Sequence, residues 1–575
     1  MRGVIFSEVS PKKIYVLVTD MFLGEPLLSR FVKIPYFCEG QEGFIVGRVV
    51  GFSGFNDLYK DEKMARSIKG SEEFELVQFA LNGLHFLVLE VELVSAFSKQ
   101  GRMNISCPVE AGLQVELLKE EDLNKLFAKH KDKLTFLGNF FGTKVPEPLY
   151  VQDFKTAGEG YHILVAGQTG SGKSTAIMML LSLYAKASKE MNFIIFDTVG
   201  EFSRTFSGKP LPGFWNSVSL KDVWRDLNRK EPEILSIHKD LAFDTWEALR
   251  TLMIDNYIFE PLDVPRSSKT NAEAGVDFLI GYLRKETKYT LGELFYRIDE
   301  ILSLLKVDVD KLAEAIYKGA DRQDSVKKRF NDSYYYDQFK EKLESIFKLF
   351  DATARKTIGD IVFSLREGNE GRTFVIDLSS AGADNGVLID NKVKKLLLKE
   401  LVSKLSINGE QLYGQGKNLN TLVVLEEAHN YVPRYESDLY TKELSETLVK
   451  AYRETRKFGL GWLAITTRVA GIRREVFEHS RIKLIGMGLN TGSDLELLKE
   501  HFGSEFADTY RLFPDPTDPL SDVKKSCFVI SGVITVLSRS LPEYVEIFSD
   551  VYEFLNKNGI RDTQIVSGLQ MLDMF

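Results

Sequence analysis

The residues with the clearest chemical meaning form a glycine-rich loop, Gly167-Gln168-Thr169-Gly170-Ser171-Gly172-Lys173-Ser174-Thr175. Its spacing is that of a phosphate-binding loop, in which glycines let backbone amides point at a phosphate. The helix expected after it adds a partial positive charge at its N-terminus. In this pattern Lys173 contacts the β and γ phosphates, and the Ser174 hydroxyl ligates Mg²⁺. The loop therefore predicts a site for ATP and Mg²⁺, with a plain glycine-rich turn as a remote alternative.

Two adjacent glutamates, Glu426 and Glu427, follow the apolar run 421–425. A buried strand that ends there would place both carboxylates at the carboxyl edge of a parallel sheet, beside the loop. Successive strand residues point to opposite faces, so the two need not share a role. We expect Glu426 to hold the Mg²⁺ shell through water and Glu427 to polarise the attacking water. A solvated acidic turn is the alternative, and the upstream loop disfavours it.

Other polar residues are predicted to complete this site. Asp197 ends the apolar run 193–196, and Glu201 follows it closely, so either carboxylate could position water or metal; for Glu201 a plain loop position is nearly as good an interpretation. Thr467 follows another apolar run and could sense the γ-phosphate. Arg453 could act within its own subunit or reach a neighbouring one. For the nearby Arg456 and Lys457, a solvated helix face is an equally good interpretation.

The elements that must position these residues can be read from the hydrophobic pattern. The order apolar run, glycine loop, helical pattern, apolar run is the start of a parallel α/β sheet. The fold class is thus α/β, a RecA-like P-loop core with a helical insertion, preceded by a small N-terminal β-barrel, for which the strand spacing also allows a sandwich. We expect the barrel at 1–120, a linker at 121–158, the core at 159–205 and 371–550, the helical insertion at 206–370 and a tail at 551–575. A final strand pair is expected at 526–531 and 533–537.

Composition narrows the function classes. With 44% hydrophobic and 27% charged residues, the chain of 575 residues reads as a globular protein of several domains. No run approaches the roughly 20 apolar residues of a membrane helix, so no membrane association and a cytoplasmic location are expected. A net charge of −8 argues against coating nucleic acid through overall basicity, although a ring needs only a basic pore. Cys38, Cys107 and Cys527 are predicted to be ordinary buried thiols.

Taken together, these motifs resemble the HerA family of hexameric ATPases, in the HerA–FtsK branch of P-loop proteins. The matching segments are the phosphate loop, Asp197 with Glu201, Glu-Glu-Ala-His at 426–429, Arg-Glu-x-Arg-Lys-Phe-Gly at 453–459, Ile-Thr-Thr-Arg at 465–468 and the late segment 527–532. The N-terminal β-rich segment also looks like the barrel of that family. The resemblance spans most of the chain, whereas the helical insertion aligns only by position.

The resemblance implies a homo-hexameric ring that moves on double-stranded DNA through its central pore and uses ATP. Archaeal members of the family work with the nuclease NurA in processing DNA ends, and bacterial relatives pair with sirtuin-like or nuclease effectors in phage defence. Two positions depart from the family pattern. Thr467 stands where a glutamine is usual, and Tyr161, followed by His162, stands where an arginine often reaches a neighbouring nucleotide. Lys155 and Arg481 are candidates to replace that contact.

Three functions are therefore open. The first is a DNA translocase or helicase with a NurA-like nuclease or another effector subunit. The second is a DNA or protein export ATPase of conjugation systems, which the N-terminal barrel disfavours. The third is a scaffold in which ATP is structural, which the intact Lys173, Ser174, Glu426 and Glu427 disfavour. Candidates for basic pore residues are Lys327-Lys328-Arg329 and Arg366, although a solvated surface explains each of them equally well.

Overall fold

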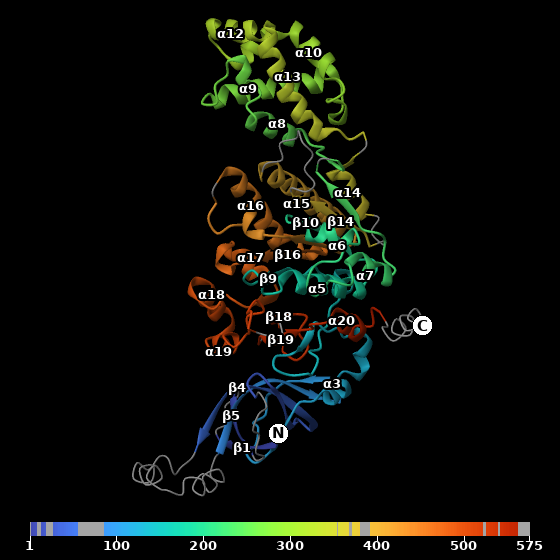
Figure 1. The fold of residues 1–575 in the computed structure, drawn as a ribbon, viewed down its shortest axis with the longest axis vertical. Coiled ribbons are helices and arrows are strands. Elements are labelled where there is room, and N and C mark those ends of the chain that lie inside the picture. Colours follow the sequence, from blue (N-terminus) through green and yellow to red (C-terminus); the bar gives the residue numbers. More distant parts are fainter. Residues whose placement is uncertain are drawn as a thin grey trace, which may run out of the picture.

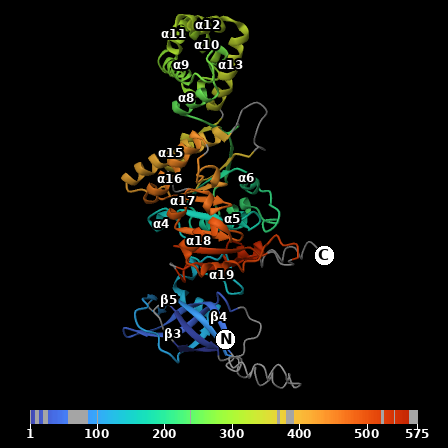
Figure 2. The same cartoon turned by 90° about the vertical axis from the view of Figure 1, so that its left-hand side faces the viewer.

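The protein consists of three parts stacked along one axis in a computed structural model (Figures 1 and 2). A β-barrel lies at one end, an α/β body lies in the middle and a helical module lies at the far end. The structure describes residues 2–7, 13–18, 27–55, 86–99, 101–237, 239–353, 355–366, 371–379, 391–436, 438–520, 525–538 and 541–561. Within these residues no helix combines the length and apolar character needed to cross a bilayer.

The N-terminal part is a closed barrel, as the sequence predicts. Its strands follow the order β2-β1-β7-β3-β4-β5, and pairing of β2 with β5 closes a ring of six. Alternating burial along β3 shows why these runs form strands, since one set of side chains fills the barrel and the other faces out. The strands are β1 (Arg2–Ser7), β2 (Lys13–Val18), β3 (Phe31–Cys38), β4 (Gln41–Phe55), β5 (Phe86–Ser98), β6 (Gly101–Met103) and β7 (Gln114–Leu117).

The prediction that all three cysteines are thiols is wrong for two of them. Cys38, at the end of β3, forms a disulfide with Cys107, and their Cα atoms are 5.6 Å apart. The two residues are separated by 69 positions in sequence, and only closure of the barrel brings the end of β3 beside the segment after β6. Cys527 is a buried free thiol on β18, and burial raises its pKa well above the ordinary value.

The body is built on a ten-stranded sheet with the order β11-β14-β10-β15-β16-β9-β17-β18-β19-β8. The strands from β11 to β17 run parallel, and the remaining three pair antiparallel. They are β8 (Gly138–Phe140), β9 (Ile163–Ala166), β10 (Asn192–Asp197), β11 (Glu233–Ser236), β14 (Thr373–Asp377), β15 (Thr421–Leu425), β16 (Leu460–Thr466), β17 (Ile482–Gly486), β18 (Cys527–Gly532) and β19 (Glu543–Ile547). This is the predicted parallel α/β core.

Helices cover both faces of this sheet, so its central strands are buried on both sides. Alternate residues of β9 pack into two different hydrophobic cores, Leu164 on one face and Val165 on the other. The helices of the body are α4 (Phe154–Ala157), α5 (Lys173–Ala187), α6 (Glu201–Phe206), α7 (Leu220–Asp226), α14 (Ile358–Arg366), α15 (Asn391–Gly414), α16 (Leu439–Glu454), α17 (Arg474–His479), α18 (Gly492–Phe502), α19 (Phe506–Tyr510) and α20 (Val551–Lys557). The short helix α3 (Glu120–Leu126) packs against the barrel instead, where Leu123 joins a cluster with Phe31 and Phe97.

Short strands extend the body beyond the predicted boundaries. β8 lies in the predicted linker but pairs with β19, and β11 lies in the predicted insertion but pairs with β14. Strands of three or four residues are too short to show a periodic pattern, and their partners are distant in sequence. The expected strand at 533–537 is also wrong, because β18 pairs with β19 instead.

The helical module is attached to the body through a two-stranded parallel ribbon, β12 (Leu241–Ala242) with β13 (Lys356–Thr357). Leu302 and Phe339 are among its fully buried residues, which explains the helical periodicity of this segment. Its helices are α8 (Trp246–Asp255), α9 (Lys269–Tyr282), α10 (Ile298–Val307), α11 (Val309–Ile316), α12 (Ala320–Asn331) and α13 (Ser333–Phe347). They lie within the predicted insertion.

Two carboxyl groups are buried together where the barrel meets the body. Glu147 and Glu543 are both fully buried, and neither carboxyl oxygen of Glu147 has a hydrogen-bond partner among the described residues. Burial and the neighbouring Glu543 raise the pKa of Glu147 well above its ordinary value. Burial also raises the pKa of Glu543, partly offset by the hydrogen bond from the Ser538 amide and by Arg48 and Arg102 of the barrel. At neutral pH the pair therefore keeps a proton that two separate glutamates would release.

The raised pKa of Glu147 predicts a pH-dependent stability. Because the folded protein keeps a proton on Glu147 that the unfolded chain has lost, stability is complete below the ordinary glutamate pKa and falls as pH rises toward the raised one, by up to about 1.4 kcal/mol per pH unit. Glu147→Gln keeps the size of the side chain and removes its titrating proton. Its melting temperature is expected to fall less between pH 6 and pH 9 than that of the native protein. The exposed Glu110→Gln is the control, and equal pH slopes for all three proteins would contradict a proton held on buried Glu147.

Candidate functional site

The predicted phosphate loop lies at the carboxyl end of β9, in the interior of the sheet. The loop is anchored to both neighbouring strands, since the Gly167 amide donates to the Thr466 carbonyl (3.3 Å) and the Gln168 amide to the Met487 carbonyl (3.0 Å). Gly170 and Gly172 have φ values of 85° and 87°, which favour glycine. Gly172 also caps the N-terminus of α5, which begins at Lys173. Amides and a helix N-terminus thus converge as an anion site requires.

Lys173 folds back over this loop. Its Nζ donates to the carbonyl oxygens of Gly167 (2.8 Å) and Gln168 (2.9 Å). Burial lowers the pKa of Lys173, and the negative charges of Glu427 and Glu201 oppose this shift. The structure therefore brings Lys173, Glu427 and Glu201 to one place, although they are far apart in sequence. An ammonium group with two carbonyl partners can exchange them for phosphate oxygens.

Glu427 lies directly after β15 in a left-handed conformation, with φ 51° and ψ 50°. This region is uncommon for residues with a side chain, and it turns the chain sharply after the strand. The Glu427 side chain is 31% exposed, and its Oε2 lies 3.2 Å from Nδ1 of His429. A half-buried carboxylate near the lysine of a phosphate loop has the chemistry needed to orient a water molecule.

Glu426 is more deeply buried and is held by the turn after β10. Its Oε2 accepts hydrogen bonds from the Thr198 amide (2.6 Å), the Thr198 hydroxyl (2.9 Å) and the Val199 amide (3.1 Å). Burial and the nearby Asp197 raise the pKa of Glu426 to about 7, while those three hydrogen bonds oppose the rise. Because these bonds use only Oε2, the other oxygen remains for a water of the Mg²⁺ shell, so the geometry fits the predicted role. The partner Thr198 was missed by the sequence interpretation, although it directly follows the strand.

Asp197 has a different task from the predicted one. The residue is fully buried, and its two oxygens accept the backbone amides of Gly200 (2.8 Å) and Ser203 (2.6 Å). The carboxylate therefore holds the start of α6 and the loop that carries Glu201, rather than a catalytic water. Asp197 ends its strand at the carboxyl edge as predicted, but its side chain points into the protein.

Thr467 lies beside the phosphate loop, as predicted. The strand pairing places Thr466 opposite Ala166, so Thr467 is the neighbour of Gly167 at the same edge. Thr467 is half-buried, whereas the following Arg468 is exposed and lies 3.3 Å from the carboxylate of Asp494. The place of Thr467 beside the loop therefore fits the predicted contact with the γ-phosphate. A threonine hydroxyl can make this contact only if the phosphate lies close to it.

Arg453 is not brought to the phosphate loop. It lies in the last turn of α16, which runs back toward the start of β16, and its guanidinium is 3.6 Å from Glu475 on α17. The phosphate loop follows the opposite ends of these parallel strands. The prediction that Arg453 could act in the nucleotide site of its own subunit is therefore wrong. The other predicted role, a contact with a neighbouring subunit, stays a prediction.

A basic cluster occupies the edge of the sheet opposite the phosphate loop. Arg456 and Arg481 precede β16 and β17, and both contact the single carboxylate of Glu159, at 3.2 Å and 2.5 Å. The Arg481 guanidinium also lies over the Tyr161 ring, 5.7 Å from its centroid. Lys155, the other candidate, forms a separate one-to-one pair with Glu190 at 2.7 Å. Two guanidiniums share one carboxylate, so the cluster of Arg456, Arg481 and Glu159 carries a net positive charge.

Three of the four candidates for a basic pore, Lys327, Arg329 and Arg366, have side-chain partners within the subunit. Lys327 pairs with Asp310 (2.7 Å) and Arg329 with Asp263 (3.0 Å), both within the helical module. Arg366 on α14 donates to the side chains of Asn408 and Gln411 on α15. Lys328 lines a shallow surface depression on α12. These contacts favour the interpretation of a solvated, paired surface.

The central part of the chain matches one family model. Residues 137–405 match the family model described as "Helicase HerA, central domain". No curated protein matches the sequence significantly.

Several solved structures match the chain at low similarity. They include VirB4 of Thermoanaerobacter pseudethanolicus (17% identity, 73% of this chain and 97% of that one, TM-score 0.36). The genome packaging NTPase B204 from Sulfolobus turreted icosahedral virus 2, solved with ATP-gammaS, matches at 10% identity (67% and 96%, TM-score 0.28). The pCW3 conjugation coupling protein TcpA matches at 10% identity over 95% of this chain and 92% of that one, with a TM-score of 0.27.

Proposed function

Because the chain carries a HerA-type central domain and is a P-loop ATPase of that kind, we propose that it is an ATP-driven translocase or helicase on double-stranded DNA. It acts as a homo-hexameric ring together with a NurA-like nuclease or another effector subunit. The observation that carries the proposal is the placement of Lys173 beside Glu427 at the carboxyl edge of the sheet.

In this proposal the phosphate loop binds ATP and each residue has a separate task. Lys173 exchanges its carbonyl partners for the β and γ phosphates, and Ser174 would hold Mg²⁺. Glu426 would accept a hydrogen bond from a water of the metal shell, and Glu427 orients the attacking water. The chemistry that the ion would supply is neutralisation of the charge on the phosphates. Asp197 and Thr198 contribute to the chemistry only through position. Asp197 holds the turn that carries Glu201, and Thr198 holds the carboxylate of Glu426.

The basic cluster on the opposite edge supports a ring. Arg456 and Arg481 cannot reach the phosphate loop of their own subunit. They lie before the first residues of β16 and β17, whereas the loop follows the last residue of β9, which runs parallel to both strands. In a head-to-tail ring, each subunit presents one face to the opposite face of the next. A guanidinium at this edge can then stabilise the phosphates of the neighbouring nucleotide, as arginine fingers do. This arrangement replaces the arginine that the family often carries at the position of Tyr161.

Two measurements test the proposal. The first is the stimulation of ATP hydrolysis by duplex DNA, and the second is the displacement of a third strand bound to a linear duplex, which is a direct sign of movement along that duplex. ATP turnover of the native protein is expected to rise several-fold with linear duplex DNA, and the third strand is expected to be displaced only with ATP. Lys173→Ala should abolish both activities. The stimulation should weaken as salt increases, since the contacts are with phosphates. ATP turnover that is indifferent to duplex DNA, with and without a partner nuclease, would overturn the motor proposal.

A further inference from the structure

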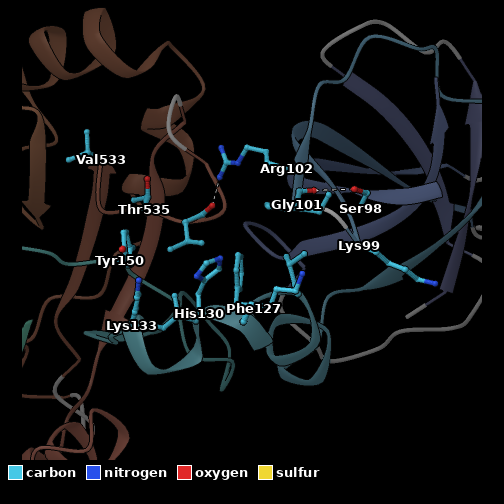
Figure 3. A pocket seen from close by; sticks show the side chains of 15 residues that line it. Ser98, Lys99, Gly101, Arg102, Phe127, His130, Lys133, Tyr150, Val533 and Thr535 are labelled. Atoms are coloured by element: carbon cyan, nitrogen blue, oxygen red, sulfur yellow. Dashed lines mark hydrogen bonds between the residues drawn. The ribbon is translucent and has the colours of Figure 1, made fainter. Parts of the chain in front are cut away.

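A cavity of about 400 Å³ lies at the seam between the barrel and the body (Figure 3), and no residue of the phosphate loop lines it. Three separate parts of the chain line it. The barrel contributes the turn between β5 and β6, the connector contributes the segment from Leu126 to Leu134, and the body contributes Tyr150 and the segment after β18. Figure 3 shows Arg102 and Gly101 on the barrel side, Val533 and Thr535 on the body side and His130 between them.

The lining is basic in an acidic protein. Five of its side chains are basic, namely Lys99, Arg102, Lys129, His130 and Lys133, and no acidic side chain lines the cavity among the described residues. The whole chain carries a net charge of −8. Within the described part of the chain, Lys99, Lys129 and Lys133 form no ion pair. Uncompensated positive charges around one hollow raise the local potential and favour an anion.

The walls between these charges are apolar and aromatic. Phe97 and Phe127 pack edge to face, with ring centroids 6.0 Å apart, and Leu134 and Val536 complete the walls. Arg102 bridges the seam, because its guanidinium lies 5.4 Å from the centroid of the Phe97 ring and donates to the Val536 carbonyl of the body. A ligand that satisfies both features needs an anionic group and a flat or apolar group.

We propose that this cavity binds a small organic phosphate of the nucleotide class. Its volume is at the lower end of the roughly 300–1,000 Å³ of small-molecule sites, and it is too small for a nucleic-acid duplex. Lys129 and Lys133 pair with the phosphate, while the base packs against the walls formed by Phe97 and Phe127. Because the ligand touches both barrel and body, binding holds them in this arrangement and makes the seam a regulatory site.

The site can be tested without interference from the phosphate loop. The full-length Lys173→Ala variant, in which binding at the loop is removed, is titrated calorimetrically with AMP, ATP and inorganic phosphate in separate experiments. One nucleotide site per chain is expected to remain. Adding Lys129→Ala and Lys133→Ala should weaken nucleotide binding at least tenfold. Lys131→Ala is the matched control, since it belongs to the same 3-10 helix (Ala128–Lys133) but does not line the cavity.

Hydrogen exchange at the seam gives a second measurement. The nucleotide is expected to protect residues 97–102 (apart from position 100), 126–134 and 533–536 in the Lys173→Ala protein and not in the triple variant. Absence of any nucleotide binding, equal weakening by Lys131→Ala, or inorganic phosphate binding as tightly as nucleotide would overturn the proposal. Binding of an acidic peptide such as oligo-glutamate in place of all nucleotides would also overturn it, since the cavity would then dock a protein. None of these results depends on whether the protein hydrolyses ATP.

Discussion

Glu427→Gln is expected to lower ATP turnover at least about a hundredfold, the usual lower bound for loss of a general base, while ATP still binds. Glutamine keeps the size of the side chain but cannot accept a proton from the attacking water. The left-handed conformation of residue 427 belongs to the backbone turn after β15, so the substitution should leave the fold intact. Steady-state hydrolysis and equilibrium binding of ATP, measured on the same preparation, separate the two effects.

Glu201→Gln is the matched control for this prediction. Glu201 also lies near Lys173, so its replacement by glutamine changes the local charge by the same amount. Glu201 lies at the start of α6, however, and not after β15. Turnover in this variant is expected to stay within a few-fold of the native value. If Glu427→Gln hydrolyses ATP at the native rate, or if the two variants are equally impaired, the assignment of Glu427 as the group that activates water is wrong.

The double variant Arg456→Ala, Arg481→Ala is expected to lose ATP turnover by about a thousandfold or more in a ring, the range for removal of an arginine finger. Its own phosphate loop and Glu427 remain intact, because both arginines lie at the opposite edge of the sheet. Lys155→Ala at that same edge is the control, since Lys155 has its own carboxylate partner and should have little effect.

Mixing two inactive proteins makes this prediction specific. The Glu427→Gln protein keeps the basic edge, and the double-arginine variant keeps the nucleotide chemistry. When subunits of both enter one ring, some interfaces pair a complete phosphate loop with a complete basic edge. Part of the ATPase activity should return on mixing and disappear when a third protein, carrying all three substitutions, replaces either partner. Failure to recover any activity from rings shown to be mixed would rule out the action of these arginines on a neighbour.

Local patterns predicted much of this protein because the physics behind them is local. The spacing of Gly167, Gly172 and Lys173 forces a backbone turn and a helix start, whatever the rest of the fold. The apolar runs before Asp197 and Glu426 are long enough to be buried strands of a parallel sheet. The carboxyl ends of neighbouring parallel strands meet at one edge, so the closeness of Lys173 and Glu427 followed from sequence as well.

Side-chain direction and distant pairing did not follow from any local pattern. Asp197 ends β10 and Glu426 directly follows β15, yet their side chains have different partners. Asp197 accepts the Gly200 amide at the start of α6, and Glu426 accepts hydrogen bonds from Thr198, because the packing of the turn decides where each side chain points. β8 pairs with a strand some 400 positions away, and Cys38 meets Cys107 only when the barrel closes.

The sequence by itself thus determined the phosphate loop, the order of the central elements and the resemblance of the central part to the HerA family. The tertiary structure decided which residues share a surface. It turned Arg453 away from its own site, gathered Arg456 and Arg481 around Glu159, buried Glu147 against Glu543 and formed a basic cavity from three distant segments. The reason is that these arrangements depend on contacts between residues far apart in sequence, which no local spacing encodes.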